Sequence, residues 1–330
     1  MKLDPRVRKL PIALFLVLLW HPLSATTPER DRCLAYRYKV LPLPLRPAAI
    51  NSRQQIVGTT SAYRAALWTE SKGVVPLPLP DGYTSSEAVA INDAGQILFM
   101  AFDRERKNRT ALLFEHGKLF ELPGTQARAY SLSPSGVIAG ESMVSDRAKM
   151  QPAIWRKHEL QTLENCCGGS AKDINDLGQV VGDFYDDQGR YHAALWSGPA
   201  ALQSIGPPDQ YSSSIAINAV GHVIIQGLPR SFLYVDGQLQ SLSLAPRYPS
   251  QVRAINSCDT IVGSFGPFSD ANRAFRWTAS SGFEDLNSLI PAGSGWKLES
   301  AVGINERGDI IGNGDLPRTD NSGFLLTPVR

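Results

Sequence analysis

One stretch decides the fold of this chain: Asp173-Ile174-Asn175-Asp176-Leu177-Gly178-Gln179-Val180-Val181-Gly182. Versions of it occur seven times among the 330 residues. Aligned on the asparagine, the copies centre on Asn51, Asn92, Ser133, Asn175, Asn218, Asn256 and Asn305, with steps of 41, 41, 42, 43, 38 and 49 residues. A nearly fixed period of this length is typical of solenoids, propellers and other repeat arrays.

The residues of each copy predict a β-hairpin. Asparagine caps a tight turn with its side chain, and a glycine three residues later supplies a backbone conformation with positive φ. Five copies carry that glycine, whereas Gln54 and Asp259 replace it in the other two. A β-branched run such as Val180-Val181 then fits a buried strand, which a further glycine closes.

Two more strands follow in each copy. The third carries an aromatic or large apolar residue near its end, as in the stretch 193–196, and the fourth is short and ends near leucine. We expect the aromatic rings to pack between neighbouring repeats. Four strands in about 42 residues are typical of a propeller blade, and no helical periodicity competes with this interpretation. The sequence therefore predicts an all-β, seven-bladed β-propeller of four-stranded blades.

The two ends of the chain predict how the ring closes. Residues Tyr36–Leu41 alternate as a strand but have no hairpin partner, while the seventh repeat (298–327) lacks its fourth strand. Pairing these segments removes two open sheet edges. We therefore expect the N-terminal strand to be the outer strand of the last blade.

The N-terminus resembles a secretory signal. Residues 1–25 place four basic side chains before the apolar run Leu10–Trp20, which is too short for a membrane-spanning helix; an uncleaved anchor is the alternative. The predicted organisation is a signal peptide (1–25), a linker (26–33) and one propeller domain (34–330), in a protein exported to the periplasm or beyond the cell. The chain has 33 basic and 31 acidic residues, so removing the four and one in residues 1–25 leaves 29 and 30. This balance predicts neither nucleic-acid binding nor membrane binding after cleavage.

The sequence predicts no cofactor and no metal site. Four cysteines, Cys33, Cys166, Cys167 and Cys258, lack the spacing of a metal site, and in an oxidising compartment they allow three disulfide pairings among which the sequence does not choose. The histidines outside the signal segment fall in different repeats without metal-ligand spacing, and no nucleophile elbow or phosphate-binding loop occurs. No residue is therefore predicted to be catalytic.

The repeat resembles that of a known family. The unit Ile-Asn-x-x-Gly-x-Val-Val-Gly, followed by triplets such as His192-Ala193-Ala194 and Arg273-Ala274-Phe275, is similar to the bacterial "HAF" extracellular repeat. The likeness extends over about residues 34–328. It implies a secreted or cell-surface propeller-like protein and brings no catalytic residues.

Departures from the repeat supply the first candidate site. Asp173 stands where other copies have Ala, Ser or Gly, and Lys172 and Arg253 stand where others have Val, Ile, Ala or Tyr. If the first strand of each blade lines the central channel, these three side chains put charge near one mouth. The alternative is that they face solvent or pair locally.

The loops entering the first strands supply the second candidate site. Tyr211, Tyr248 and Trp296 lie in these loops, which share one side of the ring, and aromatic residues often carry binding energy. The leading hypothesis is a monomeric, non-enzymatic scaffold that binds a protein or glycan partner. The alternatives are a polysaccharide-acting lyase or hydrolase with its site at the channel, and a purely structural surface protein.

Overall fold

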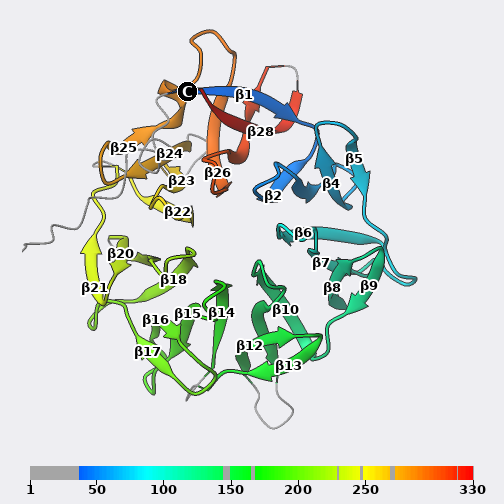
Figure 1. Ribbon diagram of the computed structural model, residues 1–330, viewed down its shortest axis with the longest axis vertical. Coiled ribbons are helices and arrows are strands. Elements are labelled where there is room, and N and C mark those ends of the chain that lie inside the picture. The colour runs from blue at the N-terminus through cyan, green and yellow to red at the C-terminus, as the bar shows by residue number, and fades with distance from the viewer. Residues whose placement is uncertain are drawn as a thin grey trace, which may run out of the picture.

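In the computed structural model, seven four-stranded antiparallel sheets surround a central axis (Figure 1). The structure describes residues 37–143, 149–164, 168–228, 230–245, 248–267, 272–317 and 319–329. The predicted signal peptide (1–25) and linker (26–33) lie outside these residues. The prediction of a seven-bladed propeller of four-stranded blades is confirmed.

Each blade takes its strands in chain order from the axis outwards, apart from blade 7. Blade 1 holds β2 (Arg46–Ile50), β3 (Ile56–Thr59), β4 (Ala65–Thr69) and β5 (Gly73–Pro76); blade 2 holds β6 (Ser85–Ile91), β7 (Ile97–Phe102), β8 (Arg109–Glu115) and β9 (Lys118–Glu121); blade 3 holds β10 (Thr125–Leu132), β11 (Ile138–Met143), β12 (Met150–Arg156) and β13 (Glu159–Thr162). Blade 4 holds β14 (Gly169–Ile174), β15 (Val180–Tyr185), β16 (Tyr191–Trp196) and β17 (Leu202–Ser204); blade 5 holds β18 (Ser212–Ile217), β19 (Val223–Gly227), β20 (Phe232–Val235) and β21 (Gln238–Ser241); blade 6 holds β22 (Ser250–Ile255), β23 (Ile261–Phe265), β24 (Arg273–Thr278) and β25 (Gly282–Asp285). A 3₁₀ turn, η1 (Leu286–Ser288), leads to blade 7, which holds β26 (Lys297–Ile304), β27 (Ile310–Leu316), β28 (Thr319–Val329) and β1 (Arg37–Leu43).

The N-terminal strand closes the ring, as predicted. Strand β1 pairs antiparallel with β28 from Arg37 opposite Val329 to Leu43 opposite Gly323. Its Tyr38 is buried, accepts a hydrogen bond at its hydroxyl from Arg276 Nη1 (3.1 Å) and donates its backbone N–H to Leu289 O (2.9 Å). The first and last strands of the propeller are thereby tied together, and to blade 6.

The alternation of strand direction defines two sides of the ring. Because every strand pair is antiparallel, the hairpin turns after the first and third strands lie on one side, which we name the turn face. The loops after the second strands and the links between blades lie on the other side, which we name the loop face.

The repeated asparagine shapes the first hairpin turn of its blade. Asn175 Oδ1 accepts the backbone N–H groups of Leu177 and Gln179, both at 3.1 Å, and Gly178 adopts a φ of 75°. The two positions without glycine, Gln54 and Asp259, also have positive φ, at 57° and 54°. The predicted turn is confirmed. In two blades a non-glycine residue adopts a backbone conformation that favours glycine.

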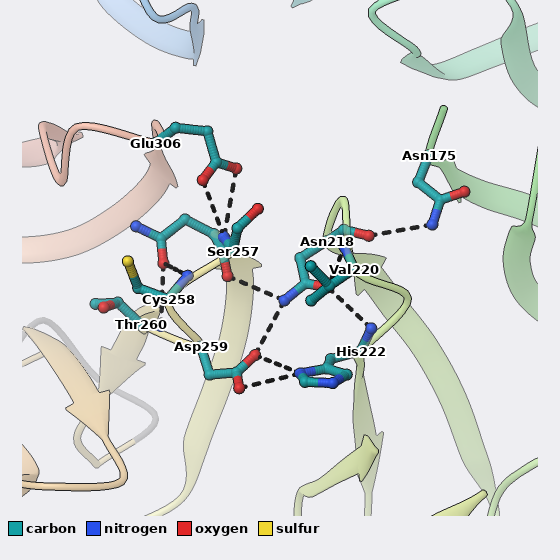
Figure 2. A network of polar contacts seen from close by, with 10 residues as sticks. Asn175, Asn218, Val220, His222, Ser257, Cys258, Asp259, Thr260 and Glu306 are labelled. Atoms are coloured by element: carbon teal, nitrogen blue, oxygen red, sulfur yellow. Dashed lines mark hydrogen bonds and ion pairs between the residues drawn. The ribbon is translucent and has the colours of Figure 1, made fainter. Parts of the chain in front are cut away.

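The same asparagines also join neighbouring blades, a role that the turn pattern did not predict. Asn175 Nδ2 donates to Asn218 O (3.1 Å), Asn218 Nδ2 donates to Asn256 O (3.1 Å), and Asn256 Nδ2 donates to Asn305 O (3.2 Å), part of which Figure 2 shows. Asn305 Nδ2 reaches Asn51 O (3.0 Å) and so continues the series across the closure. Asn51 and Asn92 extend it to Ser133 O. All seven repeat positions are described residues, and the series is interrupted among them only between Ser133 and Asn175, because serine has no amide to donate.

Restoring the missing amide should stabilise the ring. Ser133 is 1% exposed and its hydroxyl accepts the N–H of Val137 (3.0 Å), as an asparagine would. We expect Ser133→Asn to add a bond to Asn175 O and raise the free energy of unfolding by about 1 kcal/mol. Urea denaturation measures this, with Asn92→Ser as the matched change in the opposite direction. A Ser133→Asn variant less stable than the wild type would contradict the proposed continuity.

Hydrophobic clusters lie between blades rather than within them. Trp196 of blade 4 packs with Val137, Ala139 and Ile154 of blade 3, and Trp155 of blade 3 packs with Leu98 of blade 2. The predicted packing of these aromatic rings between blades is confirmed. Burial against a neighbour makes each blade depend on the next.

One of the four cysteines, Cys258, lies among the described residues. Cys258 is disulfide-bonded, whereas Cys33, Cys166 and Cys167 lie outside the described residues. Among the described residues, no helix is long and apolar enough to cross a membrane.

Candidate functional site

A β-bulge interrupts the innermost strand of every blade at the same repeat position. In blade 4 the pairing with β15 shifts between Ala171 and Asp173, which leaves Lys172 as the extra residue, and in blade 6 it leaves Arg253. Bulges unpair one residue and redirect its side chain. Two of the three charged residues that depart from the repeat therefore occupy the irregular position that all seven innermost strands share.

Lys172 forms a polar cluster between blades 4 and 5. Its Nζ lies 2.6 Å from Asp183 Oδ2 and donates to Ser213 Oγ at 2.5 Å. Ser213 donates in turn to Asp183 Oδ2, and Ser170 donates to Asp183 Oδ1, both at 2.9 Å. The positive charge is therefore neutralised locally, by an acid on the second strand of its own blade.

Asp173 has different partners and connects three blades. Its carboxylate accepts the hydroxyl of Ser131 in blade 3, the backbone N–H of Ile217 in blade 5 (2.9 Å) and the N–H of Ile174 (2.9 Å). Burial raises the pKa of Asp173 above its ordinary value, against the effect of these three donors. Asp173 bridges blades 3 and 4 next to the place where Ser133 interrupts the asparagine series, which gives this departure from the repeat a structural role.

The raised pKa of Asp173 predicts a dependence of stability on pH. A folded-state pKa above the unfolded value of about 3.9 means that the native state favours the protonated acid, so this contribution is full at low pH and is lost as pH rises through the folded pKa. We therefore expect the stability of Asp173→Asn, relative to wild type, to increase as pH rises from about 4 to 7. Denaturant titrations at several pH values measure the difference. Asp209→Asn at an exposed position is the control; a difference for Asp173→Asn that stays flat would contradict the assignment.

Blade 3 repeats the pattern of blade 4 with different residues. Tyr130 occupies the bulge, its hydroxyl donates to Glu141 Oε1 (2.8 Å), and Arg128 Nη1 lies 3.2 Å from the same oxygen. Burial, then the charge of Glu141, raises the pKa of Tyr130 to about 12. Glu141 and Asp183 both directly follow the glycine inside the second strand of their blade, Gly140 in β11 and Gly182 in β15. That position would have signalled both acids in the sequence, because the other copies have Thr59, Met100, Gln226, Ser264 and Asn313 there.

Arg253 stands apart from Lys172 and Asp173. It is exposed, and its Nη2 donates to Gln251 Oε1 (2.8 Å). Among the described residues, no hydrogen bond or ion pair links Arg253 to Lys172 or Asp173. The three charges predicted for one mouth therefore have separate surroundings: Lys172 is paired with Asp183, Asp173 is buried between blades 3, 4 and 5, and Arg253 is exposed in blade 6.

The loop face carries most of the exposed tyrosines. Four lie in its loops or at the ends of strands that reach it: Tyr63 (65% exposed), Tyr185 (41%), Tyr211 (49%) and Tyr248 (48%). Tyr211 packs against Tyr191, with ring centroids 5.2 Å apart. The predicted residue Trp296 differs, because it is half-buried and packs edge-on against Phe324 at 6.1 Å. Tyr211 and Tyr248 are therefore accessible to a partner, and Trp296 covers the core of blade 7.

Three histidines form pairs with acids, which the sequence did not predict. His158 lies 2.9 Å from Glu115, and His192 lies 3.0 Å from Asp186. His222 Nδ1 lies 2.8 Å from Asp259 on the turn face, where Asp259 also accepts the amide of Asn218 (Figure 2). The hydrogen bond from His192 holds the pKa of Asp186 far below its usual range. No group of three potential metal ligands occurs among the described residues.

These features define a seven-bladed β-propeller with polar clusters on its innermost strands and tyrosines on one face. No family model matches the chain, and no curated protein matches its sequence. Among solved structures, it is similar to virginiamycin B lyase from Staphylococcus aureus, at 14% identity and a TM-score of 0.59, over 88% of this chain and 100% of that one. It is also similar to YCF48 bound to D1 peptide (11% identity, TM-score 0.54, 89% and 96%) and to the β-propeller domain of the Trilobed protease from Pyrococcus furiosus (12%, 0.52, 76% and 81%). At these identities the likeness shows the fold alone, and it includes both enzymes and a peptide-bound protein.

Proposed function

We propose that this protein is an exported binding scaffold that holds a protein or glycan partner on its loop face and performs no catalysis. The observation that carries the proposal is the group of exposed tyrosines Tyr63, Tyr185, Tyr211 and Tyr248 on that face. Tyrosine offers a large rigid ring and a polar hydroxyl, which suits both sugar rings and protein surfaces. Loops on one face of a repeat protein are a common binding surface.

The electrostatics of the inner strands support binding over catalysis. Asp183 is held by Lys172 and two serines, Glu141 by Arg128 and Tyr130, and Asp173 by three donors. A general base needs a free lone pair within reach of its substrate. Each of these carboxylates already accepts hydrogen bonds from protein donors, so the arrangement favours a structural role over catalysis.

A polysaccharide-acting lyase or hydrolase is the second candidate, and His192 is the observation that favours it. Its Nε2 lies 3.0 Å from Asp186, on the same face as Tyr211. A histidine oriented by a carboxylate is a frequent general base. However, the His192 side chain is only 11% exposed, and Asp186 also binds Arg190 at 2.8 Å, which fits a structural pair better.

The proposal also covers the family, the localisation and the oligomeric state of the protein. We propose that it belongs with the bacterial HAF extracellular repeats, that it is exported after cleavage near residue 25, and that it acts as a monomer. The repeat unit and the signal-like N-terminus support these statements. If no partner is found, the remaining candidate function is that of a purely structural surface protein.

Retention on immobilised protein tests the proposal. Protein beginning at residue 26 is immobilised and exposed to a polysaccharide panel and to the exported proteins of a bacterial culture. We expect one class of ligand to be retained, and Tyr211→Ala combined with Tyr248→Ala to weaken its binding by about tenfold or more. Shortening of a polysaccharide by the wild type but not by His192→Ala would support the enzyme instead.

A further inference from the structure

A cavity lies at the junction of the first and last blades, on the turn face. Its volume is about 680 Å³, within the range of about 300–1,000 Å³ common for small-molecule sites. Strands β1 and β28 of blade 7 form one wall, and strand β4 and two turns of blade 1 form the other. It is separate from the loop face, and nothing in the proposed function uses it.

The charges that line this cavity are mostly positive. Lys39, Arg53 and Arg307 contribute three cations against one carboxylate, Glu70. Arg307 is partly neutralised, because its Nε and Nη2 both lie 3.1 Å from the buried Asp309. Arg53 donates to the backbone carbonyl of Asp93 and keeps its charge. The side chain of Lys39 has no hydrogen bond or ion pair to any other described residue, which leaves its Nζ available to a ligand.

The rest of the lining combines an apolar patch with the polar residues Gln54, Gln55, Thr69, Ser71 and Thr327. Leu41, Leu325 and Trp68 line the cavity, and Trp68 is 7% exposed. Trp155 and Trp196, at the same repeat position, donate their indole N–H to backbone carbonyls of the preceding link at 2.8 and 3.0 Å. Within the described part of the chain, Trp68 forms no such bond. An apolar wall beside cations suits a ligand that has both an apolar body and a negative charge.

Backbone strain occurs at the same place. Gln54 lines the cavity and has a φ of 57°, at the repeat position where five copies have glycine. Left-handed backbone is disfavoured at a non-glycine residue and occurs more often at functional positions. A glycine at this position would remove both the strained conformation and an amide side chain from the lining of the cavity.

We propose that this cavity binds a small amphipathic organic anion, a carboxylate on an apolar body. Lys39 and Arg53 pair with the carboxylate, and Trp68, Leu41 and Leu325 cover the apolar part. Because the walls come from the two ends of the propeller, the bound anion joins the first and last blades and stabilises the closed ring.

Calorimetric titration of the protein beginning at residue 26 tests this site. The probe is naphthalene-2-carboxylate, with the neutral naphthalene-2-carboxamide and inorganic phosphate as comparisons. We expect 1:1 binding of the carboxylate, binding of each comparison about tenfold weaker or more, and a melting temperature that rises with the carboxylate concentration.

Two variants locate the site. Lys39→Gln should weaken binding of the carboxylate about tenfold, and Trp68→Phe should weaken carboxylate and carboxamide alike. Lys118→Gln is the matched control, because Lys118 is an exposed lysine on β9, the outer strand of blade 2. The proposal is overturned if the carboxylate gives no binding at millimolar concentration, if the carboxamide binds equally well, or if Lys39→Gln behaves like Lys118→Gln.

Discussion

Removing strand β1 is expected to destabilise the entire propeller. The strand buries Tyr38 and Leu43, at 2% and 3% exposure, and covers the open edge of β28. Full burial of such side chains contributes about 1.5–3 kcal/mol each, and the loss of the Arg276 contact with Tyr38 adds to this. We expect a chain that begins at Pro44 to lose at least ~5 kcal/mol of unfolding free energy, a large share of what a domain usually has.

The matched control for this truncation begins at Leu34. Both proteins lack Cys33, so their cysteine content is the same and the difference reports the strand. Calorimetry should show a melting temperature lower by about 10 °C or more in the shorter protein. An unchanged melting temperature would show that the ring does not depend on closure by β1.

Trp196→Ala should have the second-largest effect. The ring is fully buried between blades 3 and 4, and its indole N–H donates to Glu164 O at 3.0 Å. Truncating a buried tryptophan typically costs about 3–5 kcal/mol through lost transfer energy and the cavity that remains. The loss should appear in urea unfolding as a lower midpoint with an unchanged slope.

Trp196→Phe separates packing from hydrogen bonding at this position. Phenylalanine keeps most of the apolar volume and removes the indole N–H, so we expect it to cost less than alanine. Equal losses for the two variants would mean that the hydrogen bond to Glu164, and not the packing between blades, holds Trp196 in place.

The sequence predicted the propeller because its signals are local. Asn175 and Gly178 define a hairpin within four residues, and the run after them defines a strand by composition alone. Counting the copies then predicts the number of blades, and the unpaired strand before Asn51 predicts the closure. Each of these inferences depends on neighbours in the chain, and each was confirmed.

The contacts between blades were not predictable in the same way. Nothing in the turn of Asn175 indicates that its Nδ2 reaches Asn218, 43 residues later, because that bond depends on how two blades pack. The partners of Lys172 and Asp173 were missed for the same reason, since Ser213 and Ile217 belong to the next blade. The bulge at the third residue before each asparagine was also not predicted. It alters the pairing of two strands, and no particular residue type marks its position in the sequence.

The turn motif and the exposed tyrosines have separate roles in this account. The motif builds the ring, and we propose that the loop face binds the partner. Two double variants separate these roles: Tyr211→Ala with Tyr248→Ala on the loop face, and Leu177→Ala with Val220→Ala on the turn face. Leu177 and Val220 are 67% and 56% exposed, so each pair removes accessible apolar surface from one side only.

The most direct measurement is the affinity of both double variants for the ligand retained by the wild type, taken alongside their melting temperatures. We predict that the loop-face variant binds about tenfold more weakly or worse, while the turn-face variant binds as the wild type does and both melt normally. Full binding by the loop-face variant, or weakened binding by the turn-face variant alone, would contradict the assignment of the partner to the loop face.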